Sequence, residues 1–332
     1  MTRARATRRL HRPQRWALVS IGLMLLGSCA TIPPPRPKIQ PPIRSLPPST
    51  LSDAPTVQPN RPAGPITFGY SGPRMQGGAV IGLAPGGTAT LSFNGAAVRV
   101  APDGRFLIAF DRDAGPSATL VATLDDGRQV SDALVVAPRG WNISRLDSLQ
   151  KYPVPEAEFA RIRPAELAEI AAARRIQVDS DGWRQPFLWP TTGRISTLFG
   201  SQRIYKNNEA GSYHSGIDIA RPTGTPVLAP ADGVVILAAD HPFTLEGNLL
   251  MIDHGADLNS AFLHLSRIDV HVGDHVRRGQ VIGAVGMTGR ATGPHLHWGL
   301  KWRDARIDPL LLAGPMAVSP SLSAAAQAGR AE

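Results

Sequence analysis

The sequence predicts a mainly β protein, and three observations lead to this fold class. Residues 66–140 are short apolar runs divided by Asn-Gly and Asp-Gly dipeptides, at the spacing expected of hairpins in a small antiparallel sandwich. Residues 185–312 are dominated by glycine- and valine-rich runs of strand length. A helical pattern is found in one segment between these regions. We therefore expect a small β-sandwich-like domain followed by a second β domain, with few helices.

The segment between the two β regions, residues 141–184, is expected to be a connector that contains a short helix. The run "PAELAEIAAARRI" over Pro164–Ile176 has its proline in the first turn, where a missing N–H costs nothing. Leu167, Ile170 and Ala171 fall on one side of such a helix. This side is expected to pack against a neighbouring element.

The N-terminus has the pattern of an export signal. Residues 1–28 hold a basic region ending at Arg15, then an apolar run from Trp16 to Leu26 that is too short to span a membrane in the mature protein. "LGSC" ends at Cys29 and resembles a bacterial lipobox, in which the cysteine becomes the lipidated first residue. The alternative is ordinary cleavage that discards Cys29. We expect an exported periplasmic lipoprotein anchored to a membrane, or otherwise a soluble periplasmic or secreted protein.

A proline-rich tether is predicted over residues 29–65, and a disordered tail over residues 313–332. Thr31–Pro65 hold 12 of the 31 prolines of the chain, a density that favours an extended spacer. At about 3.1 Å per residue, such a spacer reaches on the order of 100 Å. The tail is rich in alanine, serine and glycine.

The formal net charge of +9 does not indicate nucleic-acid binding. Six of the 35 basic residues lie in residues 1–28, where no acidic residue occurs, and the rest of the chain holds 29 basic and 26 acidic residues. A net charge of +3 over that length is ordinary. Nucleic acid is therefore not an expected partner.

Two patterns in the second β region suggest a metal site. In "TGPHLHWGL", over Thr292–Leu300, His295 and His297 project from the same face of a predicted strand. In "YHSGIDIA", His214 precedes Asp218 by four residues, about 13 Å on an unbroken strand. A bend at Gly216 would return His214 over Asp218; otherwise the two are an incidental surface pair.

Two further stretches accompany these patterns: "AFLHLS" over Ala261–Ser266, and "GRATGP" directly before His295. Together the motifs resemble those of the lysostaphin-type (LytM-like) zinc endopeptidases of bacterial peptidoglycan. The resemblance covers about Pro190–Leu312. It implies a compact antiparallel β-sheet peptidase domain of the duplicated hybrid motif type over residues 185–312, with zinc in an open groove. The sandwich-like region and the tether lie outside it.

The resemblance implies that His214, Asp218 and His297 are the zinc ligands, which leaves a fourth position for water as in catalytic zinc sites. His264 and His295 are then the catalytic residues. No H-E-x-x-H motif occurs in the chain, so histidine is expected to perform the proton transfer that a glutamate performs in other zinc peptidases. Either histidine can be the base.

The expected function is zinc-dependent hydrolysis of peptide cross-links in peptidoglycan. The lipobox, the tether and "FGSQRI" are similar to Gram-negative relatives that cut D-alanyl–diaminopimelate links. The alternative is a catalytically silent activator of a separate cell-wall amidase, although such proteins usually lack metal ligands and all five residues are present here. A biotinyl or lipoyl carrier, which "VHVGDHVRRGQVIGAVG" resembles in texture, is excluded because no lysine lies between Val270 and Leu300.

Overall fold

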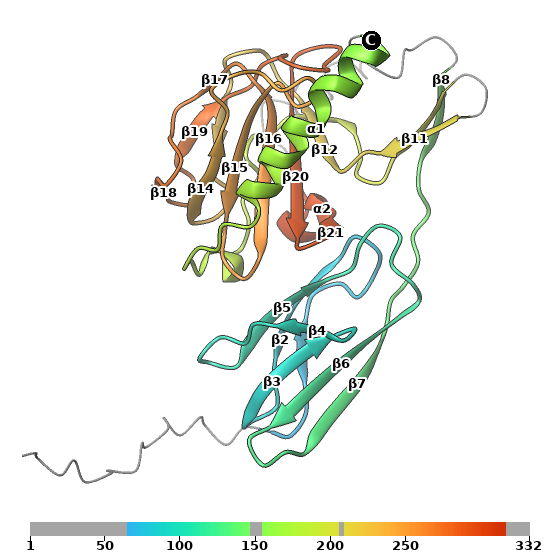
Figure 1. Ribbon diagram of the computed structural model, residues 1–332, viewed down its shortest axis with the longest axis vertical. Coiled ribbons are helices and arrows are strands. Elements are labelled where there is room, and N and C mark those ends of the chain that lie inside the picture. Colours follow the sequence, from blue (N-terminus) through green and yellow to red (C-terminus); the bar gives the residue numbers. More distant parts are fainter. Residues whose placement is uncertain (1–64, 147–154, 206–208, 317–332) are drawn as a thin grey trace, which may run out of the picture. The chain divides into compact units, whose positions relative to one another are not determined.

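The computed structural model describes residues 65–146, 155–205 and 209–316 (Figure 1). The predicted signal peptide, Cys29 and the predicted tether up to residue 64 lie outside these ranges, as does the predicted tail from residue 317. Strands far outnumber helices in the described part of the chain, so the mainly β prediction is confirmed. No helix within these ranges has the length and apolar character needed to cross a membrane.

The N-terminal β region consists of two antiparallel sheets, with strand orders β1-β2-β5 and β4-β3-β6-β7. Its strands are β1 (Gly69–Ser71), β2 (Ala79–Leu83), β3 (Thr88–Phe93), β4 (Ala96–Val98), β5 (Arg105–Ala109), β6 (Ser117–Leu124) and β7 (Gln129–Val135). Asn94 and Gly95 form the two-residue turn between β3 and β4. Both have positive φ, 48° and 80°, as the hairpin turn predicted from this dipeptide requires.

The connector contributes a strand and two helices, β8 (Ile143–Leu146), α1 (Glu156–Ala173) and the 3₁₀ helix η1 (Gly182–Arg184). Helix α1 begins eight residues before the predicted start, so Pro164 lies inside the helix and not in its first turn. The packed side overlaps the predicted one only in part: Ile170 packs against the core next to Ala173, whereas Leu167 and Ala171 are exposed and Glu166 is buried. The reason is that a buried polar contact of Glu166 anchors this helix, which an apolar pattern cannot reveal.

The C-terminal region is built on one large sheet, with strand order β18-β14-β15-β16-β20-β12-β9 and β21 paired to β20. A small sheet of order β13-β19-β17 accompanies it, and β10 pairs with both β8 and β11. The elements are β9 (Arg194–Thr197), β10 (Gln202–Tyr205), β11 (Glu209–Tyr213), β12 (Gly216–Ala220), β13 (Pro226–Leu228), β14 (Gly233–Ala238), β15 (Asn248–Asp253), β16 (Leu258–Leu265), β17 (Arg267–Ile268), β18 (His275–Val276), β19 (Val281–Ala284), β20 (His295–Trp302), β21 (Ala305–Ile307) and α2 (Pro309–Ala313).

Strand β20 occupies the middle of the large sheet, between β16 and β12. Leu296 and Trp298 are fully buried on one face, where Trp189 packs edge-on against Trp298 at 5.7 Å between ring centroids. Helix α1 runs across the sheet in Figure 1, and Ala173 at its end packs with residues of β14 and β15. Apolar packing therefore holds β20 rigidly, with its two histidines on a defined face.

The first residues of the predicted disordered tail instead pack on the domain. Ala313 is the last residue of α2. Trp189 donates its indole N–H to the carbonyl of Gly314 at 3.1 Å, and the Met316 sulfur accepts from the N–H of Gly193 at 3.2 Å. These contacts hold the residues after α2 against the domain, next to the start of β9.

Candidate metal centre and groove

Strand pairing brings Asp218 and His297 together across 79 residues of sequence. Antiparallel β12 and β20 place the two residues directly opposite each other, and β20 and β16 place His297 opposite Leu263, the neighbour of His264. Directly opposed residues have Cβ atoms about 4.5–5.5 Å apart. The sheet register thus assembles three of the five predicted residues: Asp218, His297 and His295, which lies two residues along β20 on the same face.

The fourth, His214, reaches the same point because the chain turns between β11 and β12. The turn falls at His214 and Ser215, just before the predicted bend at Gly216, which is already the first residue of β12. A Cβ at Gly216 would lie 2.3 Å from the carbonyl oxygen of Trp298 and 2.7 Å from His297 Nε2. Glycine is therefore required for close approach of β12 to β20.

His214, Asp218 and His297 form a triangle of converging ligand atoms. His214 Nε2, Asp218 Oδ1 and His297 Nδ1 are each 2.9 Å from the other two. The carboxylate carries no hydrogen and each ring nitrogen carries at most one, so at most two hydrogens serve three contacts. Three such atoms facing one point are arranged to bind a cation.

The donor set fits zinc. His214 Nδ1 lies 3.2 Å from the carbonyl oxygen of Leu198, so this nitrogen can donate its hydrogen there and leave Nε2 with a free lone pair. Two imidazole nitrogens and one carboxylate oxygen are ligands that zinc takes at about 2.0–2.2 Å, which separates tetrahedral ligands by about 3.3 Å. The observed triangle needs to open by a few tenths of an ångström to accept the ion.

The electrostatics of the triangle favour an ionised carboxylate at Asp218 and a neutral ring at His297. Burial by itself raises the pKa of Asp218, but hydrogen bonds and charge from His214 and His297 outweigh it and hold that pKa far below the usual range. Burial lowers the pKa of His297, despite the opposing hydrogen bond with Asp218. These are the protonation states that metal binding requires.

His264 and His295 flank the triangle with one nitrogen of each ring fixed by the backbone. His264 Nδ1 lies 2.8 Å from the carbonyl oxygen of Thr288, and His295 Nδ1 lies 2.8 Å from that of Gly293. Both rings therefore donate from Nδ1, which leaves Nε2 free of that bond. His295 Nε2 lies 3.7 Å from Asp218 Oδ1, and the centroids of the His264 and His295 rings are 4.7 Å apart.

Burial, with the neighbouring His297, lowers the pKa of His264 to about 4. Its ring is neutral at neutral pH and can accept a proton. The backbone of His264 is held at a φ of 64°, a left-handed conformation that is uncommon outside glycine, and its N–H donates to the carbonyl of Glu246 at 2.8 Å. Sequence reasoning missed Glu246 and Thr288, because both act through backbone carbonyls that leave no pattern of residue types.

The five residues lie in an open groove of about 1050 Å³. Its walls come from β9, from the β10–β11 hairpin, from the loop of residues 289–294 and from Asn142 and Ser144 near β8. Tyr205 and Arg290 close one side through a 3.0 Å hydrogen bond between the guanidinium and the phenol oxygen. A groove of this kind accommodates an extended polymer better than a small compact ligand.

The remaining described histidines stand apart from the triangle. His254 is fully buried, and its nitrogens lie 2.8 Å from the carbonyl oxygen of Asp232 and from Ser260 Oγ, a structural role. His241, His271 and His275 are exposed. The fold thus separates five clustered histidine and aspartate side chains from four histidines with no contact to them.

A β-sheet domain with a His-Asp-His triangle and two further histidines in a groove defines the metallopeptidase type of site. Residues 212–309 match the model of Peptidase family M23, and the C-terminal region is an M23 peptidase domain homologous to lysostaphin-type peptidoglycan endopeptidases. The resemblance to lysostaphin-type endopeptidases that the sequence motifs indicated is therefore confirmed.

Two curated relatives and one solved structure illustrate the similarity. The chain is 43% identical over 126 residues to peptidoglycan DD-endopeptidase ShyA of Vibrio cholerae serotype O1, covering 38% of this chain and 29% of ShyA. It is 40% identical over 135 residues to DD-carboxypeptidase/endopeptidase Mpg of Neisseria meningitidis serogroup B, covering 41% of this chain and 30% of Mpg. The chain thus spans about three-tenths of the length of these relatives.

The crystal structure of a peptidase M23 from Pseudomonas aeruginosa superposes with a TM-score of 0.55 at 29% identity. The match covers 73% of this chain and 95% of that one, so the shared architecture extends beyond residues 212–309.

Proposed function

We propose that this chain is a zinc-dependent endopeptidase that hydrolyses peptide cross-links of bacterial peptidoglycan. The observation that carries the proposal is the 2.9 Å triangle of His214, Asp218 and His297 beside two further histidines, at the base of an open groove in an M23 domain. The names of the relatives ShyA and Mpg, an endopeptidase and a carboxypeptidase/endopeptidase, support the same reaction class.

In this proposal His214, Asp218 and His297 hold the zinc ion. When bound, zinc supplies Lewis-acid activation of water and polarisation of a substrate carbonyl. The chain supplies the geometry: the β12–β20 pairing fixes Asp218 and His297, and the Leu198 carbonyl fixes the ring of His214.

His264 and His295 transfer protons. Nδ1 of each ring is committed to a backbone carbonyl, and Nε2 of His295 lies 3.7 Å from Asp218 Oδ1, so Nε2 is the nitrogen that can accept a proton and later deliver it to the leaving amine. A histidine that has taken up this proton on Nε2 can also donate it to the carbonyl oxygen on which negative charge develops. Either histidine can take either role in this geometry.

The bond that we propose is the D-alanyl–diaminopimelate cross-link. It follows from the resemblance of the export signal, the tether and "FGSQRI" to Gram-negative enzymes, and the name DD-endopeptidase of ShyA supports it. We further propose that the protein is exported to the periplasm and held at a membrane by lipid on Cys29. Peptidoglycan lies in that compartment.

The test is conversion of cross-linked muropeptide dimers into monomers by the purified mature protein, followed by chromatography and mass spectrometry of the new termini. Chelation should stop the reaction and added zinc should restore it. His214→Ala, Asp218→Ala and His297→Ala should lose both zinc and activity, because each removes one of three ligands. His264→Ala and His295→Ala should keep zinc and lose activity by roughly 10²–10⁴-fold.

A matched control is His275→Ala, since this histidine is exposed and lies on β18 at the edge of the sheet. It should retain both zinc and activity. Full zinc occupancy in His214→Ala would contradict the ligand assignment. If the zinc-loaded protein leaves dimers intact but accelerates hydrolysis by a separate amidase, the activator function replaces the one proposed here.

A further inference from the structure

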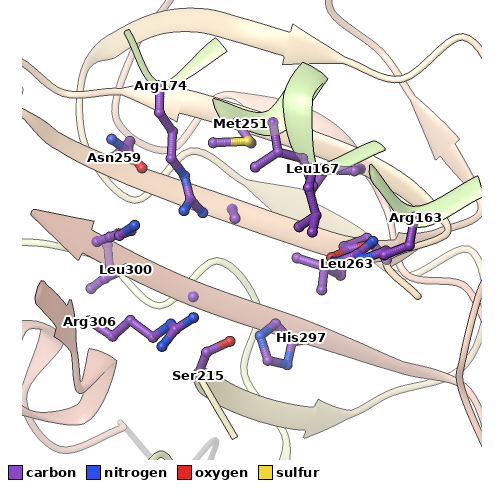
Figure 2. A pocket seen from close by; sticks show the side chains of 16 residues that line it. Arg163, Leu167, Arg174, Ser215, Met251, Asn259, Leu263, His297, Leu300 and Arg306 are labelled. Atoms are coloured by element: carbon purple, nitrogen blue, oxygen red, sulfur yellow. The ribbon is translucent and has the colours of Figure 1, made fainter. Parts of the chain in front are cut away.

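A second cavity of about 160 Å³ lies beside the metal centre, between helix α1 and the strands β16 and β20 (Figure 2). Ser215, Leu263 and His297 line both this cavity and the groove. A substrate held in the groove is therefore within reach of the cavity. We call it the α1 cavity.

Three basic side chains from three elements meet at the α1 cavity. Arg174 follows the last turn of α1, Lys301 lies on β20 and Arg306 lies on β21. In Figure 2 the side chains of Arg174 and Arg306 extend into the same space. Burial and the charge of Arg306 lower the pKa of Arg174, and burial and the charge of Arg174 lower the pKa of Lys301. The protein thus holds mutually repelling cations together.

The neighbouring carboxylates offset the charge of this cluster only in part: Glu246 and Asp304 raise the pKa of Arg174, but burial and the charge of Arg306 outweigh them. Glu246, the carboxylate among the lining residues, is engaged by Arg163 through two contacts of 2.6 Å. Lys301 reaches Asp304 at 3.5 Å, on a fully exposed side chain where an ion pair contributes little. Arg174 and Arg306 form no ion pair with any residue that the structure describes, although Arg306 donates to the Tyr213 hydroxyl at 3.0 Å and lies 5.1 Å from the centroid of that ring.

The α1 cavity also contains polar atoms without hydrogen-bond partners. Asn259 on β16 is 5% exposed, and its Oδ1 accepts no hydrogen bond from the described residues. The Nε of Arg174 is likewise buried and unpartnered. A buried unsatisfied polar group costs about 1–3 kcal/mol, and folded proteins retain few of them. Cations without a buried carboxylate of their own, beside an unused acceptor, are suited to a ligand that brings negative charge and an N–H group.

We propose that the α1 cavity is a substrate subsite that binds a free carboxylate of the peptidoglycan stem peptide, with a neighbouring N–H donated to Asn259. The proposal rests on the proposed function. Arg174, Arg306 and Lys301 bind the carboxylate by charge-assisted hydrogen bonds. A cavity of about 150 Å³ holds a molecule the size of benzene, so the α1 cavity admits the end of one amino-acid unit and not a whole peptide.

The chemistry of the proposed cross-link matches this subsite. In a D-alanyl–diaminopimelate link, a free carboxylate is attached to the carbon that carries the scissile nitrogen. The α1 cavity shares His297 with the metal centre, so a carboxylate bound there would place the adjoining peptide bond near the triangle. The subsite would therefore select for carboxylate and against carboxamide at this position.

The test compares two dimers that differ only in this group, one with the free carboxylate and one with a carboxamide. Arg174→Gln and Arg306→Gln should each lower kcat/KM on the carboxylate dimer by about 10- to 100-fold, mainly through KM, as expected for loss of a charge-assisted hydrogen bond. The carboxamide dimer should be cleaved equally by all forms. Arg175→Gln is the matched control, because Arg175 is exposed and adjacent to Arg174. Equal losses on both dimers, or no loss on either, would overturn the subsite.

Direct binding separates this proposal from the proposed function. Calorimetry with the His264→Ala protein should compare a stem tripeptide ending in diaminopimelate with the same tripeptide amidated at the carboxylate beside the side-chain amine. The carboxylate form should bind more tightly, and Arg174→Gln should remove the difference. This result would support the subsite even if no dimer were cleaved. Cleavage without carboxylate preference would leave the function standing and remove the subsite. Inorganic phosphate that competes as well as the tripeptide would show a general anion site and refute the substrate assignment.

Discussion

The anchoring of helix α1 by Glu166 gives a prediction whose size can be worked out from the structure. Glu166 is 5% exposed and accepts hydrogen bonds from the Thr244 N–H at 2.5 Å, the Thr244 hydroxyl at 2.6 Å and Arg163 at 3.0 Å. Hydrogen bonds to a charged group contribute about 1.5–3 kcal/mol. Glu166→Gln keeps one acceptor oxygen but loses the charge, and it turns an NH₂ group toward Thr244 or Arg163.

We expect Glu166→Gln to lower the free energy of opening of α1 by about 2–3 kcal/mol, below the sum of the three bonds because the Thr244 hydroxyl can accept from the new amide. The measurement is hydrogen–deuterium exchange of peptides that cover α1, which should become about 30- to 150-fold faster. Glu169→Gln, at an exposed position of the same helix, is the control.

The stabilisation of α1 by Glu166 should depend on pH. Burial alone raises the pKa of Glu166, but the bonds from Thr244 and Arg163 outweigh it, so the net pKa is lowered. The contribution of Glu166 is therefore present above the ordinary carboxyl pKa and is lost as the pH falls through the lowered one. The difference between wild type and Glu166→Gln should shrink in acid. Equal exchange in Glu166→Gln and Glu169→Gln at neutral pH would refute the anchoring argument.

Three further predictions concern other parts of the chain. Burial lowers the pKa of His254 to about 4, so its contribution to stability is complete above pH ~6.5 and is lost as the pH falls toward 4. Over this range, denaturant unfolding should show that wild type loses about 3 kcal/mol more free energy of unfolding than His254→Gln. The same pH dependence of the free energy of unfolding in both proteins would contradict this prediction. Gly216→Ala places a Cβ 2.3 Å from the carbonyl oxygen of Trp298, so it should lower the free energy of unfolding by about 1–3 kcal/mol and weaken zinc binding in a chelator competition. The control Gly115→Ala, whose Cβ would have no atom within 4 Å, should change neither quantity. Cys29→Ser should move the protein from the membrane fraction to the soluble fraction or leave its precursor uncleaved; unchanged processing and fractionation would exclude the lipid anchor.

The sequence by itself determined the fold class and the identity of the clustered residues. The Asn94-Gly95 dipeptide predicted a two-residue hairpin because both residues must adopt positive φ, and the structure has that turn. The spacing of His295 and His297 predicted one shared strand face, since side chains alternate along a strand, and both lie on β20 facing Asp218. Such local rules depend only on neighbouring residues.

Tertiary structure decided what depends on residues distant in sequence. The partnership of Glu166 with Thr244 places a carboxylate on the packed side of α1, because a buried charge is stable only beside a partner that no local pattern identifies. The roles of Thr288 and Glu246 toward His264 come from backbone carbonyls, which every residue possesses. The α1 cavity likewise exists because a helix and two strands bring Arg174, Lys301 and Arg306 to its walls, and the energy of such a cluster depends on distances in space that the order of residues does not contain.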